Sequence, residues 1–205
     1  MKRLNALTLA AGLAFASSAA QAALVNAGFE TGNFSGWSVT IPPGGAANVQ
    51  STPGAGGITP FAGAYMAQLK TDGPGSFTTL SQSISLSVGG DVSGHVNWYD
   101  AELASNQPAQ YNDTVMVQIL NSANAVVATP FFDQHSGNTQ VVNGWQLWSF
   151  VASAADTYKV VYKITNGGDS IVDSFAYFDN IPEPASTALF GLGLLGLGFL
   201  RRRKA

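Results

Sequence analysis

Few residues of this chain are of a type that carries out catalysis. There are two histidines, His95 and His135, twelve Asp and Glu residues, and no cysteine. No serine stands in a Gly-x-Ser-x-Gly turn, and the histidines lack the short spacing of a zinc site. Asp100 and Glu102 directly follow a predicted strand, which indicates loop carboxylates rather than a glycosidase pair. We therefore expect no catalytic residues, with a secreted hydrolase as the alternative.

The stretch from 23 to 180 is acidic. It has three lysines and no arginine against eleven carboxylates, a net charge of −8, because the other cations stand near the two ends of the chain. So few cations cannot neutralise a phosphate backbone, which excludes nucleic acid as a partner. Divalent cations are more natural partners, and the lack of cysteine means that no disulfide stabilises this stretch.

Alternating side chains predict β-strands in the same stretch. The period of two is clearest in "TLSQSISLSVGG", "DTVMVQIL" and "TYKVVYKI", and Gly, Pro and Asp turns separate such runs. This pattern predicts an all-β fold of one domain, an antiparallel sandwich or barrel. The Gly- and Pro-rich segment 41–63 is interpreted as a long loop that crosses one end or edge of the sandwich.

Residues 1–22 have the pattern of a secretory signal peptide. Two cations precede an apolar run, and small residues stand at Ala20 and Ala22. The run is about a dozen residues long, too short for the ~20 that span a bilayer as a helix. Cleavage after Ala22 is therefore expected, and an uncleaved membrane anchor is the alternative.

The chain closes on a tail of three parts. They are Pro182, Glu183 and Pro184, an apolar run at 185–200, and the cations Arg201, Arg202, Arg203 and Lys204. A helix over the apolar run would be about 24 Å long, a little short of a ~30 Å hydrocarbon core. The positive-inside rule would keep the basic residues 201–204 in the cytoplasm. A plain membrane anchor and a removable address both fit this pattern.

The tail resembles the PEP-CTERM sorting signal of Gram-negative bacteria that make exopolysaccharide. The Pro-Glu-Pro triplet, the Gly- and Leu-rich transmembrane span and the Arg-rich end stand in that order within 182–205. The resemblance implies export by the general secretion machinery and transient insertion in the inner membrane. It also implies recognition by exosortase, a membrane-embedded Cys protease-like enzyme, with release or transfer of the protein to the cell surface or extracellular matrix.

The stretch "LVNAGFETGNFSGWSV" resembles the opening of a galactose-binding-like jelly roll, the fold of several carbohydrate-binding modules. The matching positions are Asn26, Gly28, Phe29, Glu30, Gly32, Gly36 and Trp37. Later segments follow that family in order, from "GAYMAQL" to "SFAYFDNI". The resemblance implies a jelly-roll β-sandwich at 23–181.

The same family often carries a structural calcium ion between its first and last strands. By resemblance, Glu30 and Asp179 would lie close together and hold the ion, and the turn from Lys70 to Asp72 would supply carbonyl oxygens and a further carboxylate. Calcium takes six to eight oxygen ligands, which carboxylates and turns provide. The alternative is that Glu30 and Asp179 accept hydrogen bonds from turn amides.

Sugar recognition needs exposed aromatic faces rather than reactive groups. Trp37 and Trp145 match framework aromatics of the resembled fold, and Trp98 alternates with core positions, so all three are expected in the core. The remaining candidates for a sugar platform are Tyr99, Tyr111 and Trp148. The alternative is that they are ordinary outer-face aromatics. We expect an exported, non-enzymatic surface or matrix protein that binds glycan, or else a purely structural one without a specific ligand.

Overall fold

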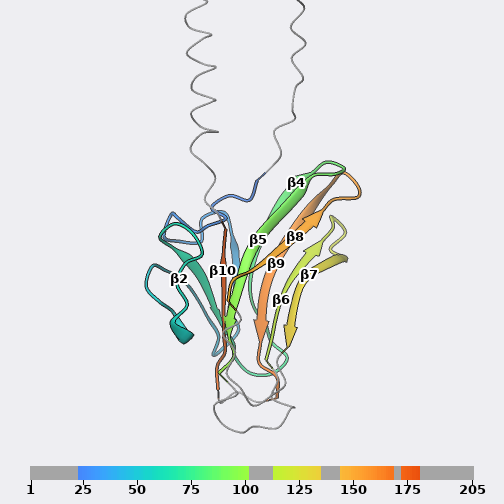
Figure 1. Ribbon diagram of the computed structural model, residues 1–205. Coiled ribbons are helices and arrows are strands. Elements are labelled where there is room, and N and C mark those ends of the chain that lie inside the picture. The colour runs from blue at the N-terminus through green and yellow to red at the C-terminus, as the bar shows by residue number, and fades with distance from the viewer. Residues whose placement is uncertain (1–22, 102–112, 135–143, 169–171, 181–205) are drawn as a thin grey trace, which may run out of the picture.

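The computed structural model describes residues 23–101, 113–134, 144–168 and 172–180. They form two five-stranded antiparallel sheets that pack face to face (Figure 1). The predicted signal peptide, the tail from Pro182 onward, Glu102, Tyr111 and His135 lie outside the described residues.

Sheet 1 has the strand order β1-β4-β9-β6-β7, and sheet 2 has the order β2-β3-β10-β5-β8. The strands of sheet 1 are β1 (Ser38–Thr40), β4 (Thr78–Leu86), β9 (Asp156–Thr165), β6 (Thr114–Leu120) and β7 (Val126–Gln134). The strands of sheet 2 are β2 (Ala46–Gln50), β3 (Met66–Lys70), β10 (Phe175–Asp179), β5 (Asp91–Tyr99) and β8 (Gln146–Val151). A short 3-10 turn, η1 (Ala55–Gly57), lies between β2 and β3.

Successive strands mostly alternate between the two sheets. Only the hairpins β2-β3 and β6-β7 keep neighbours in the chain together in one sheet. Such alternation of antiparallel strands between two sheets is the jelly-roll arrangement. The predicted fold class is therefore confirmed, and the three runs of alternating residues are β4, β6 and β9.

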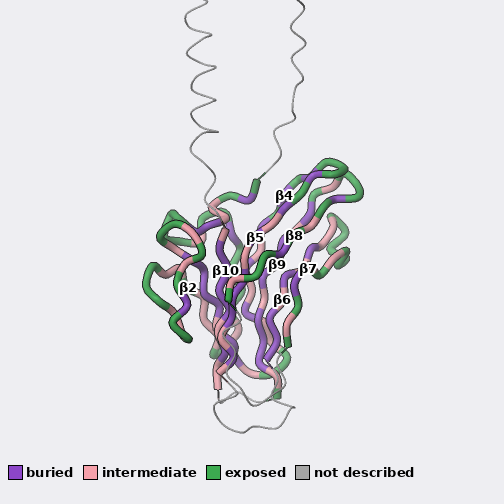
Figure 2. Tube along the Cα trace, in the orientation of Figure 1, coloured by how far each residue is buried: buried purple, intermediate pink, exposed green. Residues whose placement is uncertain are grey.

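The strand β4 illustrates how the alternating pattern builds the sandwich. Its apolar residues Leu80, Ile84 and Leu86 are buried, while the serines between them face outward (Figure 2). Gln82 also points inward, where its amide exchanges two hydrogen bonds with the backbone of Val25, at 2.5 and 2.9 Å. A buried amide satisfied in this way ties the N-terminal segment to the sheet.

An aromatic stack joins the two sheets in the core. Tyr162 of β9 lies flat on Phe178 of β10, with ring centroids 4.2 Å apart and an interplanar angle of 2°. Trp37 stacks with the same tyrosine at 5.1 Å, and Trp148 meets it edge-on at 5.7 Å. Each such pair contributes about 0.5–1.5 kcal/mol beyond the burial of its area.

Residues 51–64, called the strap below, cross the outer face of sheet 2. Ile58 is buried there against Met66 and Tyr177. Gly54 lies so close to the Tyr177 ring that a β-carbon would collide with it. The segment 41–63 was predicted to be one long loop at an end or edge of the sandwich. Its residues 46–50 instead form β2, the edge strand of sheet 2, and the strap lies on the outer face because Ile58 is buried there.

Candidate functional site

The outer face of sheet 2 carries three rows of polar and aromatic side chains. The strand pairing defines them as Lys70, Phe175 and Tyr99, then Asn48, Gln68, Tyr177 and Asn97, and finally Asp179, His95 and Leu147. In the middle row the Gln68 amide donates to the Tyr177 hydroxyl at 2.9 Å. This face differs from the serine-lined outer face of β4 in its amide and aromatic side chains, of which Gln68 and Asn97 lie buried under the strap.

Two carboxylates fix the strap at the end of the sandwich where β10 finishes. Asp179 Oδ2 accepts the backbone N–H groups of Phe61 and Ala62, at 2.8 and 3.1 Å. Glu30 accepts the N–H groups of Ala64 and Tyr65 at 3.0–3.1 Å. The backbone N–H groups of four residues between 61 and 65 thus donate to two carboxylates. Hydrogen bonds to a charged acceptor are stronger than those to a neutral one.

The environment of Asp179 changes its acidity. Burial raises the pKa of this carboxyl from 3.8 to about 7, and the nearby Glu30 charge acts in the same direction. The amides of Phe61, Ala62 and Asn180 oppose the rise because they stabilise the carboxylate. Asp179 therefore changes charge close to neutral pH while it holds the strap.

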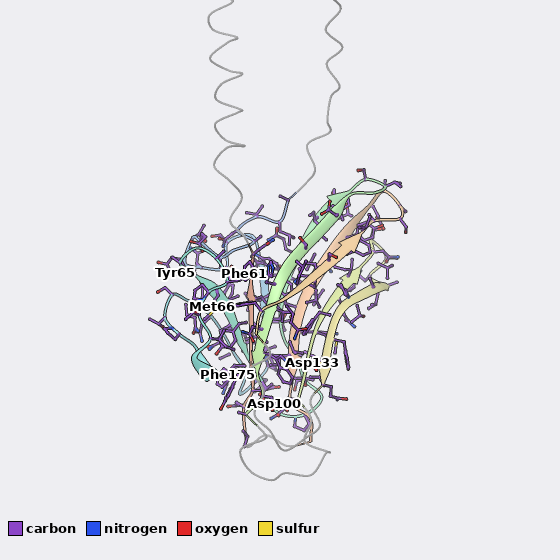
Figure 3. All side chains as sticks on the ribbon, in the orientation of Figure 1. Phe61, Tyr65, Met66, Asp100, Asp133 and Phe175 are labelled. Atoms are coloured by element: carbon purple, nitrogen blue, oxygen red, sulfur yellow. The ribbon has the colours of Figure 1, made fainter. Side chains whose placement is uncertain are left out.

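The predicted calcium ligands only partly come together. Glu30 and Asp179 lie at one end, as the resemblance implied, but Asp72 follows β3 at the other end, beyond the pair Lys70 and Phe175. Figure 3 shows Phe61 at the first end and Phe175 at the second. Within the described residues, no three potential side-chain ligands gather around one point.

The contacts of the two remaining carboxylates do not fit a calcium site either. Their oxygens already face backbone N–H groups, whereas calcium would require neighbouring oxygen donors. The arrangement matches the alternative interpretation, in which Glu30 and Asp179 accept hydrogen bonds from turn amides. The resemblance predicted calcium here, whereas these amide contacts lead us to expect no calcium between Glu30 and Asp179.

An aromatic cluster lies beside these carboxylates, on the outer face of β5 and β8. Phe61 of the strap stacks on His95, with ring centroids 3.6 Å apart, and Trp145 meets Phe61 edge-on at 6.0 Å. The Trp145 indole N–H donates to the Thr59 carbonyl at 3.0 Å. Phe61 is 38% exposed, and Trp145 is half-buried. Contacts with the strap thus fix the orientation of aromatic rings that still reach the surface.

The predicted locations of two tryptophans were wrong, and the structure reverses them. Trp148, expected at the surface, is 1% exposed and lies in the core. Its ring occupies the space over Gly94, its partner across β5 and β8, where a β-carbon would approach within 2.9 Å. Trp145, expected in the core, instead lies half-buried on the outer face.

Tyr99 is the sugar-platform candidate that the structure leaves partly accessible. It packs with Trp145 and Phe175 around the small cluster of Ile58, Met66 and Tyr177. We call Phe61, His95, Trp145 and Tyr99 the aromatic platform. Of these, sequence reasoning had identified only Tyr99. A lone phenylalanine within the Gly- and Pro-rich segment was the one available signal for Phe61.

The platform carries no cationic side chain. Burial lowers the pKa of His95 below its usual 6.5, so the imidazole is neutral at pH 7. Lys70 pairs with Asp173 at 2.7 Å at the far end of β3, while Lys159 and Lys163 belong to sheet 1. These are the three cationic side chains among the residues that the structure describes.

Comparison with protein families bears on the tail. Residues 180–204 match the family model of the PEP-CTERM protein-sorting motif, which confirms the tail resemblance. The described part of the chain holds no helix long and apolar enough to cross a membrane, and the apolar run at 185–200 lies outside it. None of the curated proteins matches the chain.

Several solved structures have a similar overall shape. TmCBM61 in complex with β-1,4-galactotriose aligns with a TM-score of 0.49 and 17% identity, over 78% of this chain and 95% of that one. Family 16 Carbohydrate Binding Module-2 aligns with a TM-score of 0.41 and 17% identity, over 77% and 96%. The CBM22-1 xylan-binding domain of Paenibacillus barcinonensis Xyn10C gives 0.36 and 14%, over 75% and 87%. At these scores the likeness adds nothing to the jelly roll that the strand pairing defines.

Proposed function

We propose that this chain is an exported, non-enzymatic surface or matrix protein that binds glycan through the aromatic platform. Export and surface location follow from the PEP-CTERM motif, with the tail processed by an exosortase. The cell would be a Gram-negative bacterium, and the secretion machinery would carry the chain across its inner membrane.

The observation that carries the glycan proposal is the set of partly exposed rings on the outer face of sheet 2. A sugar ring presents a face of C–H groups, which packs well on a flat aromatic surface. Phe61 and Trp145 supply such surfaces in fixed orientations because His95 and Thr59 hold them. A preorganised surface loses less conformational entropy when a ligand binds.

The charges favour a neutral polysaccharide over an acidic one. His95 is neutral, and Lys70, which lies in the same cross-strand row as Tyr99, is already paired with Asp173. Among the described residues, no unpaired cation therefore lies in this row to attract uronic acid or phosphate groups. The nearby Glu30 and Asp179 would repel them at pH 8, where the Asp179 carboxyl has lost its proton. We therefore expect neutral glucans, galactans or xylans to bind more tightly than acidic polysaccharides.

Affinity gel electrophoresis with a panel of neutral and acidic polysaccharides tests this proposal. Trp145→Ala should abolish retardation by the ligand, with at least a tenfold loss of affinity. The matched control is Phe132→Ala, which removes a 58% exposed aromatic ring from β7 of the other sheet and should leave retardation unchanged. Equal effects of the two substitutions would refute the platform.

A structural role without a ligand is the second candidate, and one observation favours it. The strap covers much of the face, so that Gln68 and Asn97 are 9% and 5% exposed. Polar groups sealed in this way cannot reach a sugar unless the strap moves. Failure of every polysaccharide to retard the folded protein, at pH 5 and at pH 8, would select this candidate.

A further inference from the structure

The last described strand has a central place in its sheet. β10 pairs with β3 on one side and β5 on the other, along almost its whole length. Its inward residues Ala176 and Phe178 are fully buried, and Phe178 forms the stack with Tyr162. A central strand cannot leave its sheet without breaking two ladders and opening the core.

The residue after the strand is also fixed. Asn180 donates its side-chain N–H to the Ser93 carbonyl at 2.9 Å and its backbone N–H to Asp179 at 2.7 Å. On the other side lies Gly28, where a β-carbon would come within 2.7 Å of the Asn180 carbonyl oxygen. The chain is therefore enclosed by the opening segment and by β5 up to a point two residues before Pro182.

Cleavage by a protease requires a segment that can be drawn out of the fold into an active site. Exposed segments are cut readily, whereas segments in a sheet are cut only from an opened state. The PEP-CTERM match begins at Asn180, which is the last residue that the structure describes and is still held by the fold. The matched range of the sorting motif thus overlaps the described fold at this residue.

We propose that the folded domain excludes cleavage at every bond from Phe175 through Asn180, so that the mature protein keeps the whole of β10 and Asn180. This inference rests on the proposed processing of the tail. Where processing releases the protein, the reaction is hydrolysis of one peptide bond: the C–N bond breaks, the carbonyl carbon receives the hydroxyl of water, and the new amino group of the tail receives the proton. The strap stays anchored afterwards, because Asp179 remains on the domain side of the cut.

Mass spectrometry of the full chain, produced in a cell that processes the motif, is the first test. We expect the C-terminal residue of the mature protein to be Asn180 or a later residue. A mature chain that ends at Asp179 or earlier would overturn the inference and leave the proposed processing intact. An uncut tail would instead overturn the proposed processing, and the second test would then decide the inference alone.

The second test is limited digestion of the purified full chain by proteinase K, followed by intact-mass analysis. We expect a resistant fragment whose C-terminus lies at Asn180 or beyond. In the variant Asp179→Ala,Asn180→Ala, which lacks the contacts that hold this boundary, trimming past residue 180 into β10 should be at least tenfold faster than in the natural chain. The control Asp91→Ala alters an exposed carboxylate on β5 and should digest like the natural chain. Trimming of the natural chain to Asp179 or earlier would refute the inference.

Discussion

Replacement of Asp179 by asparagine should remove a large part of the pH dependence of stability. The carboxyl is buried, and its pKa is raised from 3.8 to about 7 in the folded protein. Between these values the folded state holds a proton that the unfolded state has lost, so stability falls as the pH rises. Above about pH 7 both states are charged, and this contribution becomes constant.

The magnitude follows from the two pKa values. Each pH unit between them costs about 1.4 kcal/mol, which gives about 4 kcal/mol across the window from pH 4 to pH 7. Asparagine has no proton to lose, so the free energy of unfolding of Asp179→Asn should rise relative to that of the natural chain as the pH increases. The amide has one acceptor oxygen in place of two, so either the N–H groups of Phe61 and Ala62 or the N–H of Asn180 lose their acceptor. The amide does not titrate, so this cost in the variant does not depend on pH.

Urea denaturation in the presence of EDTA, followed by tryptophan fluorescence at several pH values from 4.5 to 8, measures the difference. His95 contributes with the opposite sign, because its lowered pKa makes the fold less stable at acid pH, but it contributes equally to both proteins. Asp91→Asn is the control, since its carboxylate is exposed. A difference between natural chain and Asp179→Asn that is constant across the range would refute the reasoning.

Three further predictions concern the core, the strap and the metal. Trp148→Ala should destabilise the fold by about 3–5 kcal/mol in urea denaturation, because the indole is buried; a cost typical of a surface residue would contradict its place in the core. Gly54→Ala should cost about 1–3 kcal/mol, because the added β-carbon collides with Tyr177 under the strap; unchanged stability would mean that the strap does not pack on Tyr177. EDTA should leave the melting temperature unchanged, because amides already satisfy Glu30 and Asp179. A lower melting temperature in EDTA that calcium restores, and that Asp179→Ala no longer shows, would instead reveal a calcium ion at this site.

Trp145, just before β8, and Trp148 within it show what a single sequence does not decide. In "GWQLWSFV" apolar residues occupy both parities, so the period of two does not decide which face is buried. Trp148 points inward because Gly94 on the neighbouring strand leaves room for it. That room depends on the register of β5 and β8, which a single sequence does not contain.

The predicted calcium ligands also depend on contacts between residues that are far apart in the sequence. The sequence resemblance brought Glu30 and Asp179 together correctly, since they flank the first and last parts of the fold. It also placed Asp72 with them, and this was wrong because β3 and β10 run in opposite directions. Whether Glu30 and Asp179 bind a metal or a loop depends on which groups approach their oxygens. In the structure these are backbone N–H groups at the end of the strap.

The sequence alone determined the class of fold and the sorting tail. Both rest on local patterns: alternation along β4, β6 and β9, turns between them, and three consecutive blocks at the C-terminus. Only the tertiary structure decided which aromatic rings reach the surface. The reason is that the platform residues come from β5, the start of β8 and the strap, which lie far apart in the sequence. The pairing of β5 with β8 and the burial of Ile58 against Tyr177 bring them together.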